Sequence, residues 1–199
     1  MEAPFPRGKS WTMNFGSAVA GSTDGIEFEG VDKDFSDYDW VNYPKRRTNR
    51  YVRCRIVRNS SGIALKPSRL VQLDAANYYN HALGYTITDG QRGYPVDEFL
   101  PSGGVLANDL FWVVLRGPAM LLSGLNADGT NVITQGQEVT ALTTAASSQG
   151  SSAGAVKSAI SSGATTPLFN EIAHFIGVAL SSLTTGNTGA NVLVDVRMI

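Results

Sequence analysis

Few residues in this chain are suited to covalent or metal chemistry, because it contains one cysteine and two histidines. Cys54 stands between Arg53 and Arg55, and neighbouring positive charges can lower the pKa of a thiol and favour a nucleophilic thiolate. Cys54 nevertheless alternates with apolar residues, so we expect it on the buried face of a strand, as a small core residue. His81 and His174 form no HxH or HxxxH pair, and we expect ordinary, partly buried side chains.

Carboxylates offer no better catalytic or metal-binding pattern. The spacing of Asp32, Asp34 and Asp37 is similar to that of a calcium-binding loop. An EF-hand loop, however, requires Gly at its sixth position and Glu at its twelfth. Those positions hold Asp37 and Tyr43, so the EF-hand is excluded and only a looser calcium site stays open. There is no phosphate loop or dinucleotide fingerprint. The sequence therefore predicts no enzyme and no cofactor.

The separation of acidic and basic residues into two segments is the most distinctive feature of the sequence. Residues 24–39 carry a net charge of −6, and residues 45–69 carry +9 with no acidic residue. We predict that these segments form an interface, whose candidate residues are Asp32, Asp34, Asp37, Asp39, Trp40, Arg46, Arg47, Arg50, Arg53 and Arg55. Three arrangements are open. The segments can pair within one subunit, they can meet across subunits or against a partner, or the basic segment can line a nucleic-acid groove. The last is weakened by the adjacent carboxylates and by a net charge of −1.

The elements that must position these residues are strands. Residues 51–57 alternate between apolar and basic side chains, as in a half-buried strand. Residues 110–116 are apolar on both faces, which predicts a covered central strand that Gly117-Pro118 ends. Asp74 can cap a short helix over residues 74–82. Short strands separated by Gly-rich turns predict a mainly β chain, a small β-barrel or β-sandwich with at most one or two short helices. We expect residues 1–44 to be an extended N-terminal arm and residues 45–199 a single β-rich domain.

Length and composition agree with one domain, since 199 residues can bury one core. Only 17% of the residues are charged, against a norm of about 25%. The longest uncharged apolar stretch, residues 110–115, is too short for a bilayer span of about 20 residues. The N-terminus has no apolar run of signal-peptide length. We therefore expect a protein made in a cytoplasm, with no membrane partner.

The second half of the chain carries a family resemblance. Its motifs are VDEFLP at 96–101, VLANDLFWVV at 105–114 leading into RGP at 116–118, ITQGQEV at 133–139 and IGVALS at 176–181. Their order over residues 60–199 resembles the small β-rich head decoration (capsid cement) proteins of tailed bacteriophages. The acidic arm is not part of that pattern. The resemblance implies a non-enzymatic virion protein, often trimeric, that sits outside the capsid and clamps neighbouring major capsid subunits.

A carbohydrate- or receptor-binding β module on the virion is the alternative function. Its stacking platforms would be aromatic side chains, and the candidates are Trp40, Tyr43, Tyr78, Tyr79 and Trp112. We expect Trp112 in the core, which leaves the arm and the Tyr78-Tyr79 turn as exposed positions. An enzyme of unknown type is a third hypothesis, which any turnover abolished by a single carboxylate substitution would revive.

Overall fold

The computed structural model describes residues 7–10, 24–31, 51–88, 91–124, 132–142, 153–159, 175–184 and 189–198. Its strands are β1 (Glu27–Val31), β2 (Tyr51–Asn59), β3 (Leu70–Leu73), β4 (His81–Gly84), β5 (Gly93–Pro95), β6 (Leu110–Leu122), β7 (Glu138–Ala141), β8 (Val156–Ser158), β9 (Phe175–Ala179) and β10 (Asn191–Arg197). One 3-10 turn, η1 (Ala75–Asn77), interrupts them. The prediction of a mainly β chain is confirmed. No helix in the described part is long and apolar enough to cross a membrane.

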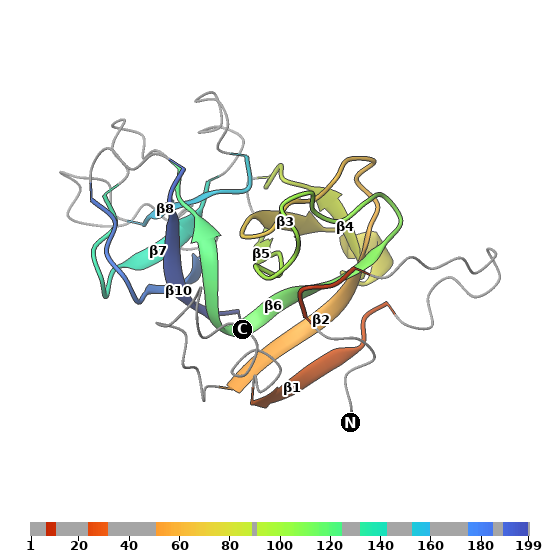
Figure 1. The fold of residues 1–199 in the computed structure, drawn as a ribbon, viewed down its shortest axis with the longest axis horizontal. Helices are drawn as coiled ribbons and strands as arrows, with labels where there is room; N and C mark the ends of the chain where they lie inside the picture. The colour runs from red at the N-terminus through yellow and green to blue at the C-terminus, as the bar shows by residue number, and fades with distance from the viewer. Residues whose placement is uncertain are drawn as a thin grey trace.

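The strands form one hydrogen-bonded sheet in the order β5-β3-β4-β2-β6-β10-β9-β7-β8, with β1 paired to β2 outside this path (Figure 1). The pairings between these strands are antiparallel, except that of β2 with β4, which is parallel. The strand order runs from β5 to β8 without closing on itself, so the sheet is not the closed barrel that was one of the two predicted architectures.

Strand β6 holds the two halves of the sheet together. Its first part pairs with β2 from Leu110 to Arg116, and its second part pairs with β10 from Arg116 to Leu122. The predicted break at Gly117-Pro118 is wrong, because the strand continues through both residues. Gly117 has φ of +106°, a value that suits glycine. The β2 ladder ends at Arg116, so Pro118 removes no hydrogen bond from it.

The two faces of β6 contribute to two different hydrophobic clusters. Leu110, Trp112 and Val114 belong to the larger cluster, whereas Phe111 and Val113 belong to the smaller one, and all five are buried. This alternation confirms the prediction of a covered central strand. It also explains why both faces of β6 are apolar, because each face packs in a different hydrophobic cluster.

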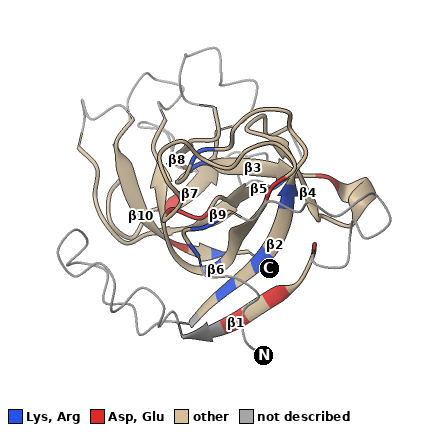
Figure 2. Ribbon diagram, turned by 45° about the vertical axis from the view of Figure 1, so that its right-hand side comes forward, with Lys and Arg blue, Asp and Glu red and all other residues tan. Residues whose placement is uncertain are grey.

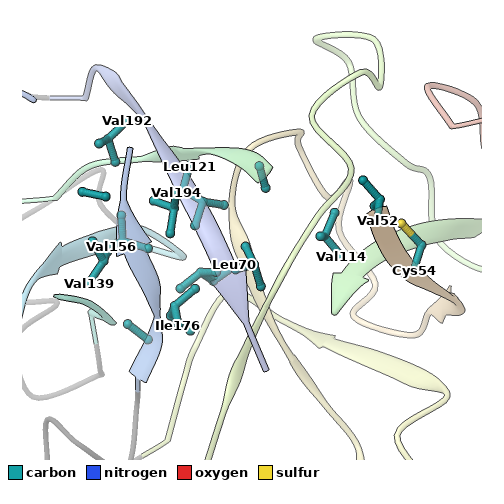
Figure 3. Packing of buried hydrophobic residues seen from close by; sticks show 14 of the residues in the cluster. Val52, Cys54, Leu70, Val114, Leu121, Val139, Val156, Ile176, Val192 and Val194 are labelled. Carbon is teal, nitrogen blue, oxygen red and sulfur yellow. The ribbon is translucent and has the colours of Figure 1, made fainter. Parts of the chain in front are cut away.

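The predicted alternation along β2 is confirmed as well. Val52, Cys54 and Ile56 are at most 1% exposed, and all three lie in the larger cluster. Figure 3 shows Val52 and Cys54 beside Val114 of β6. The Cys54 thiol is buried and packed among apolar side chains. It is therefore the small core residue that the sequence predicted.

The helix predicted over residues 74–82 is wrong beyond its first turn. Asp74 does cap it, because its Oδ1 accepts a hydrogen bond of 2.9 Å from the Ala76 amide. The turn ends at Tyr78, which has φ of +53°, and Tyr79 follows with φ of +60°. These left-handed residues stop the helix, so the chain returns directly into β4 at His81.

Candidate functional site

Acidic and basic segments meet where β1 lies along β2. The register places Glu27 opposite Arg55 and Glu29 opposite Arg53. Glu27 lies between the two arginines, accepting from Nε of Arg53 at 2.8 Å and from Nε of Arg55 at 2.9 Å. We call these three residues the charged seam (Figure 2). Among the described residues, the opposite charges therefore pair within one subunit, which was one of the three open arrangements.

The charged seam also determines the titration of Glu27. Burial by itself would raise the pKa of this carboxyl above its ordinary value of 4.5. Hydrogen bonds and positive charge from Arg55 and Arg53 act in the opposite direction and prevail, so the net pKa is lowered. The carboxylate is thus ionised and bound to both guanidinium groups at neutral pH.

A second ion pair joins Asp24, which lies just before β1, to Arg58 near the end of β2. The Asp24 side chain is only 2% exposed and accepts from Nε of Arg58 at 3.1 Å. His81 Nε2 lies 3.5 Å from the same carboxylate. The Gly25 amide donates to the Ile56 carbonyl at 2.9 Å, so backbone hydrogen bonds hold this segment as well.

A third contact anchors residues 7–8 to the domain. The Asp97 side chain is fully buried, and its Oδ1 lies 3.2 Å from Nη2 of Arg7. Asp97 also accepts from the amides of Gly8 and Phe99. The Arg7 guanidinium lies 5.0 Å from the centre of the Phe99 ring. No local sequence pattern predicted this contact, because Arg7 and Asp97 are 90 residues apart in the chain.

Most of the predicted interface residues fall outside the described residues, namely Asp32, Asp34, Asp37, Asp39, Trp40, Arg46, Arg47 and Arg50. Arg53 and Arg55 are described, and both contact Glu27 of their own chain. The predictions of a partner interface and of a looser calcium site therefore stay predictions. In the described part, no three His, Cys, Asp or Glu side chains gather as metal ligands would.

A group of three exposed, large apolar side chains lies on three neighbouring segments. We call it the apolar rim, and it consists of Ile63, Leu83 and Leu106, which are 51%, 46% and 64% exposed. The Asn59 side-chain amide donates to the carbonyls of Ile63 and Val105 at 2.7 and 2.9 Å. Backbone bonds join Ser60 to Ala82 and Leu65 to Val105. These cross-links fix the three segments relative to one another.

A polar cleft of about 530 Å³ lies next to the rim. Its lining residues come from the same segments and from the region before β1, and they are Asp24, Arg58, Ser60, Asn77, Tyr78, Asn80, His81 and Asn108. The prediction of an exposed Tyr78-Tyr79 turn fits this geometry, since Tyr78 is 83% exposed and Tyr79 is 42% exposed. Trp112, at 1% exposure, is the core residue that we expected.

The chain matches no protein-family description, no curated protein and no solved structure.

Proposed function

We propose that this chain is a non-enzymatic virion protein that binds the outside of a capsid shell and stabilises contacts between major capsid subunits. The apolar rim is the observation that carries this proposal. Large apolar side chains that are exposed on neighbouring segments favour a protein-binding site. Leu106, at 64% exposure, would gain the most from being covered by a partner.

The rigidity of the rim supports docking rather than transient contact. Asn59, fully buried, holds the Ile63 and Val105 carbonyls with one amide group. A surface that is ordered before it binds loses less conformational entropy on association, and more of its contact energy appears as affinity. The rim is therefore suited to the same contact repeated at many equivalent positions.

The segment between β1 and β2, residues 32–50, supplies a further contact in this proposal. Val31 and Tyr51 are paired in the register of β1 and β2, so the 32–50 segment leaves and re-enters the sheet at the same place. This segment carries Asp32, Asp34, Asp37, Asp39, Trp40, Arg46, Arg47 and Arg50. The charged seam fixes its starting point, and we propose that its charges steer binding to a neighbouring subunit.

Many copies on one lattice would make the contact effective even where a single one is weak, because linked binding events reinforce one another. We propose a homotrimer as the binding unit, with the major capsid protein as the partner and neither nucleic acid nor membrane involved. Native mass spectrometry of the purified protein checks the oligomer. A mass of three chains is expected, and a monomer at every concentration would contradict it.

Imaging tests the function directly. Purified protein is mixed with undecorated capsids of the virus whose genome carries its gene, and the shells are reconstructed by electron cryomicroscopy. The proposal predicts added density at regular lattice positions on the outer surface. Shells without such density would reject it, and so would turnover of a substrate by the purified chain.

A further inference from the structure

We propose that the polar cleft beside η1 is a binding site for a neutral saccharide. This inference goes beyond capsid decoration and stands or falls independently of it. Its volume of about 530 Å³ is within the range of small-molecule sites, about 300–1,000 Å³.

The first argument is the way in which the chain presents Tyr78. The residue is 83% exposed although hydrogen bonds hold its backbone. The Tyr78 amide donates to the Ala75 carbonyl at 3.2 Å, and the Tyr79 amide donates to the Asp74 carbonyl at 2.8 Å. The turn thus holds an aromatic ring out at the edge of the cleft. An apolar ring face with a polar tip is the surface on which the C–H face of a sugar can pack.

Backbone strain gathers around the same cleft. Four described residues other than glycine have positive φ, and two of them, Tyr78 at +53° and Asn108 at +70°, line the cleft. Tyr79, at +60°, is the neighbour of Tyr78. Asparagine adopts this conformation readily, but tyrosine adopts it at an energetic cost, and such strain clusters at ligand sites.

The second argument is that the cleft contains polar side-chain groups whose hydrogen-bonding capacity is open to a ligand. Within the described part of the chain, no hydrogen bond occupies the Ser60 hydroxyl or the side-chain amides of Asn80 and Asn108. A hydroxyl and two amides provide both donors and acceptors. Sugar hydroxyls also donate and accept, so these groups match the ligand in kind.

The charges of the cleft favour a neutral ligand over an anion. The Arg58 guanidinium is occupied, since Nε and Nη2 contact Asp24 and Nη1 donates to the Asn108 carbonyl at 3.1 Å. Asp24 cancels the positive charge of Arg58. An anionic ligand such as a phosphate would find no free guanidinium fork here and would meet the Asp24 carboxylate instead.

Tyr78 and Tyr79 provide a matched pair of variants. Both have left-handed backbones, so Tyr78→Ala and Tyr79→Ala introduce alanine under nearly equal strain. Of these two tyrosines, only Tyr78 lines the cleft. The full-length protein and both variants are applied to a glycan array, and the neutral oligosaccharide with the strongest signal is titrated by calorimetry.

We expect wild-type protein to bind a neutral oligosaccharide, Tyr78→Ala to bind at least about tenfold more weakly, and Tyr79→Ala to bind within about twofold of wild type. As a check that needs no variant, adding the saccharide must shift the aromatic NMR resonances of Tyr78. Absence of neutral glycan binding, binding of acidic glycans alone, or equal binding by Tyr78→Ala and wild type would overturn the inference. Capsid binding by Tyr78→Ala is expected to be unchanged, so the two proposals fail separately.

Discussion

Glu27 joins β1 to β2, because its one carboxylate accepts hydrogen bonds from two guanidinium groups of β2. Its pKa is lower in the folded protein than its ordinary value of 4.5. A lowered pKa means that ionised Glu27 stabilises the fold. This contribution is complete above about pH 4.5 and disappears as the pH falls through the folded-state pKa.

Glu27→Gln should therefore lower the free energy of unfolding by about 1 kcal/mol at pH 7, as expected for a partly exposed ion-pair cluster. The difference from wild type should shrink as the pH falls below 4.5 and through the lowered folded-state pKa of Glu27. Urea denaturation at a series of pH values measures it. A difference that is independent of pH would show that the charged seam does not act through ionisation.

Asp97 is expected to matter more than any exposed carboxylate. Its side chain is fully buried, and Arg7 is only 8% exposed, so removing the carboxylate takes the ion-pair partner Asp97 away from a buried guanidinium. Asp97→Ala should cost about 3 kcal/mol or more. The control is Asp195→Ala, because Asp195 pairs with the 58% exposed Arg197 and should cost less than about 1 kcal/mol. Equal losses in the two variants would mean that the Arg7 contact does not anchor the N-terminal residues.

At the scale of the elements, the strands with one apolar face were predictable and the turns were not. Val52, Cys54 and Ile56 had to face inward because the alternating residues are basic. The course of β6 through Gly117-Pro118 depends on β2 ending its ladder at Arg116, which no local pattern reveals. The end of η1 depends on left-handed Tyr78, which local propensity disfavours.

Strands β9 and β10 approach each other at a glycine for a steric reason. A Cβ built on Gly177 would lie 2.1 Å from the carbonyl oxygen of Asp195. Gly177→Ala must push the strands apart, and we expect a loss of about 2 kcal/mol or more in thermal or urea unfolding. Gly103→Ala is the control, since nothing lies within 4 Å of its Cβ and its φ is not in the left-handed region. Matching melting temperatures for the two variants would contradict the close approach.

At the scale of the whole molecule, the charge pattern was visible in the sequence, but the pairing within one chain was not. Asp24 and Glu27 belong to the acidic segment, yet only the register of β1 on β2 selects Arg55, Arg53 and Arg58 as their partners. The apolar rim was not predictable either, because Ile63, Leu83 and Leu106 are far apart in the sequence. Asn59 cross-links two of these segments, but its burial is known only from the structure.

The 32–50 segment should contribute to assembly through its acidic residues. Replacing Asp32, Asp34, Asp37 and Asp39 together by Asn removes four negative charges. We expect weaker binding to capsids or weaker trimerisation, with the largest effect in low salt, where exposed charges are least screened. Cosedimentation at two salt concentrations measures this effect. Unchanged assembly in low salt would dismiss the electrostatic role of the arm.

Cosedimentation of rim variants with undecorated capsids tests the central claim most directly. Leu106→Asp places a charge in the apolar rim, while Val132→Asp places the same charge at another exposed apolar position, 37% exposed. Both side chains are exposed, so both variants should fold. The account predicts that Leu106→Asp loses at least about tenfold in capsid affinity and that Val132→Asp binds like wild type. Wild-type binding by Leu106→Asp would contradict it.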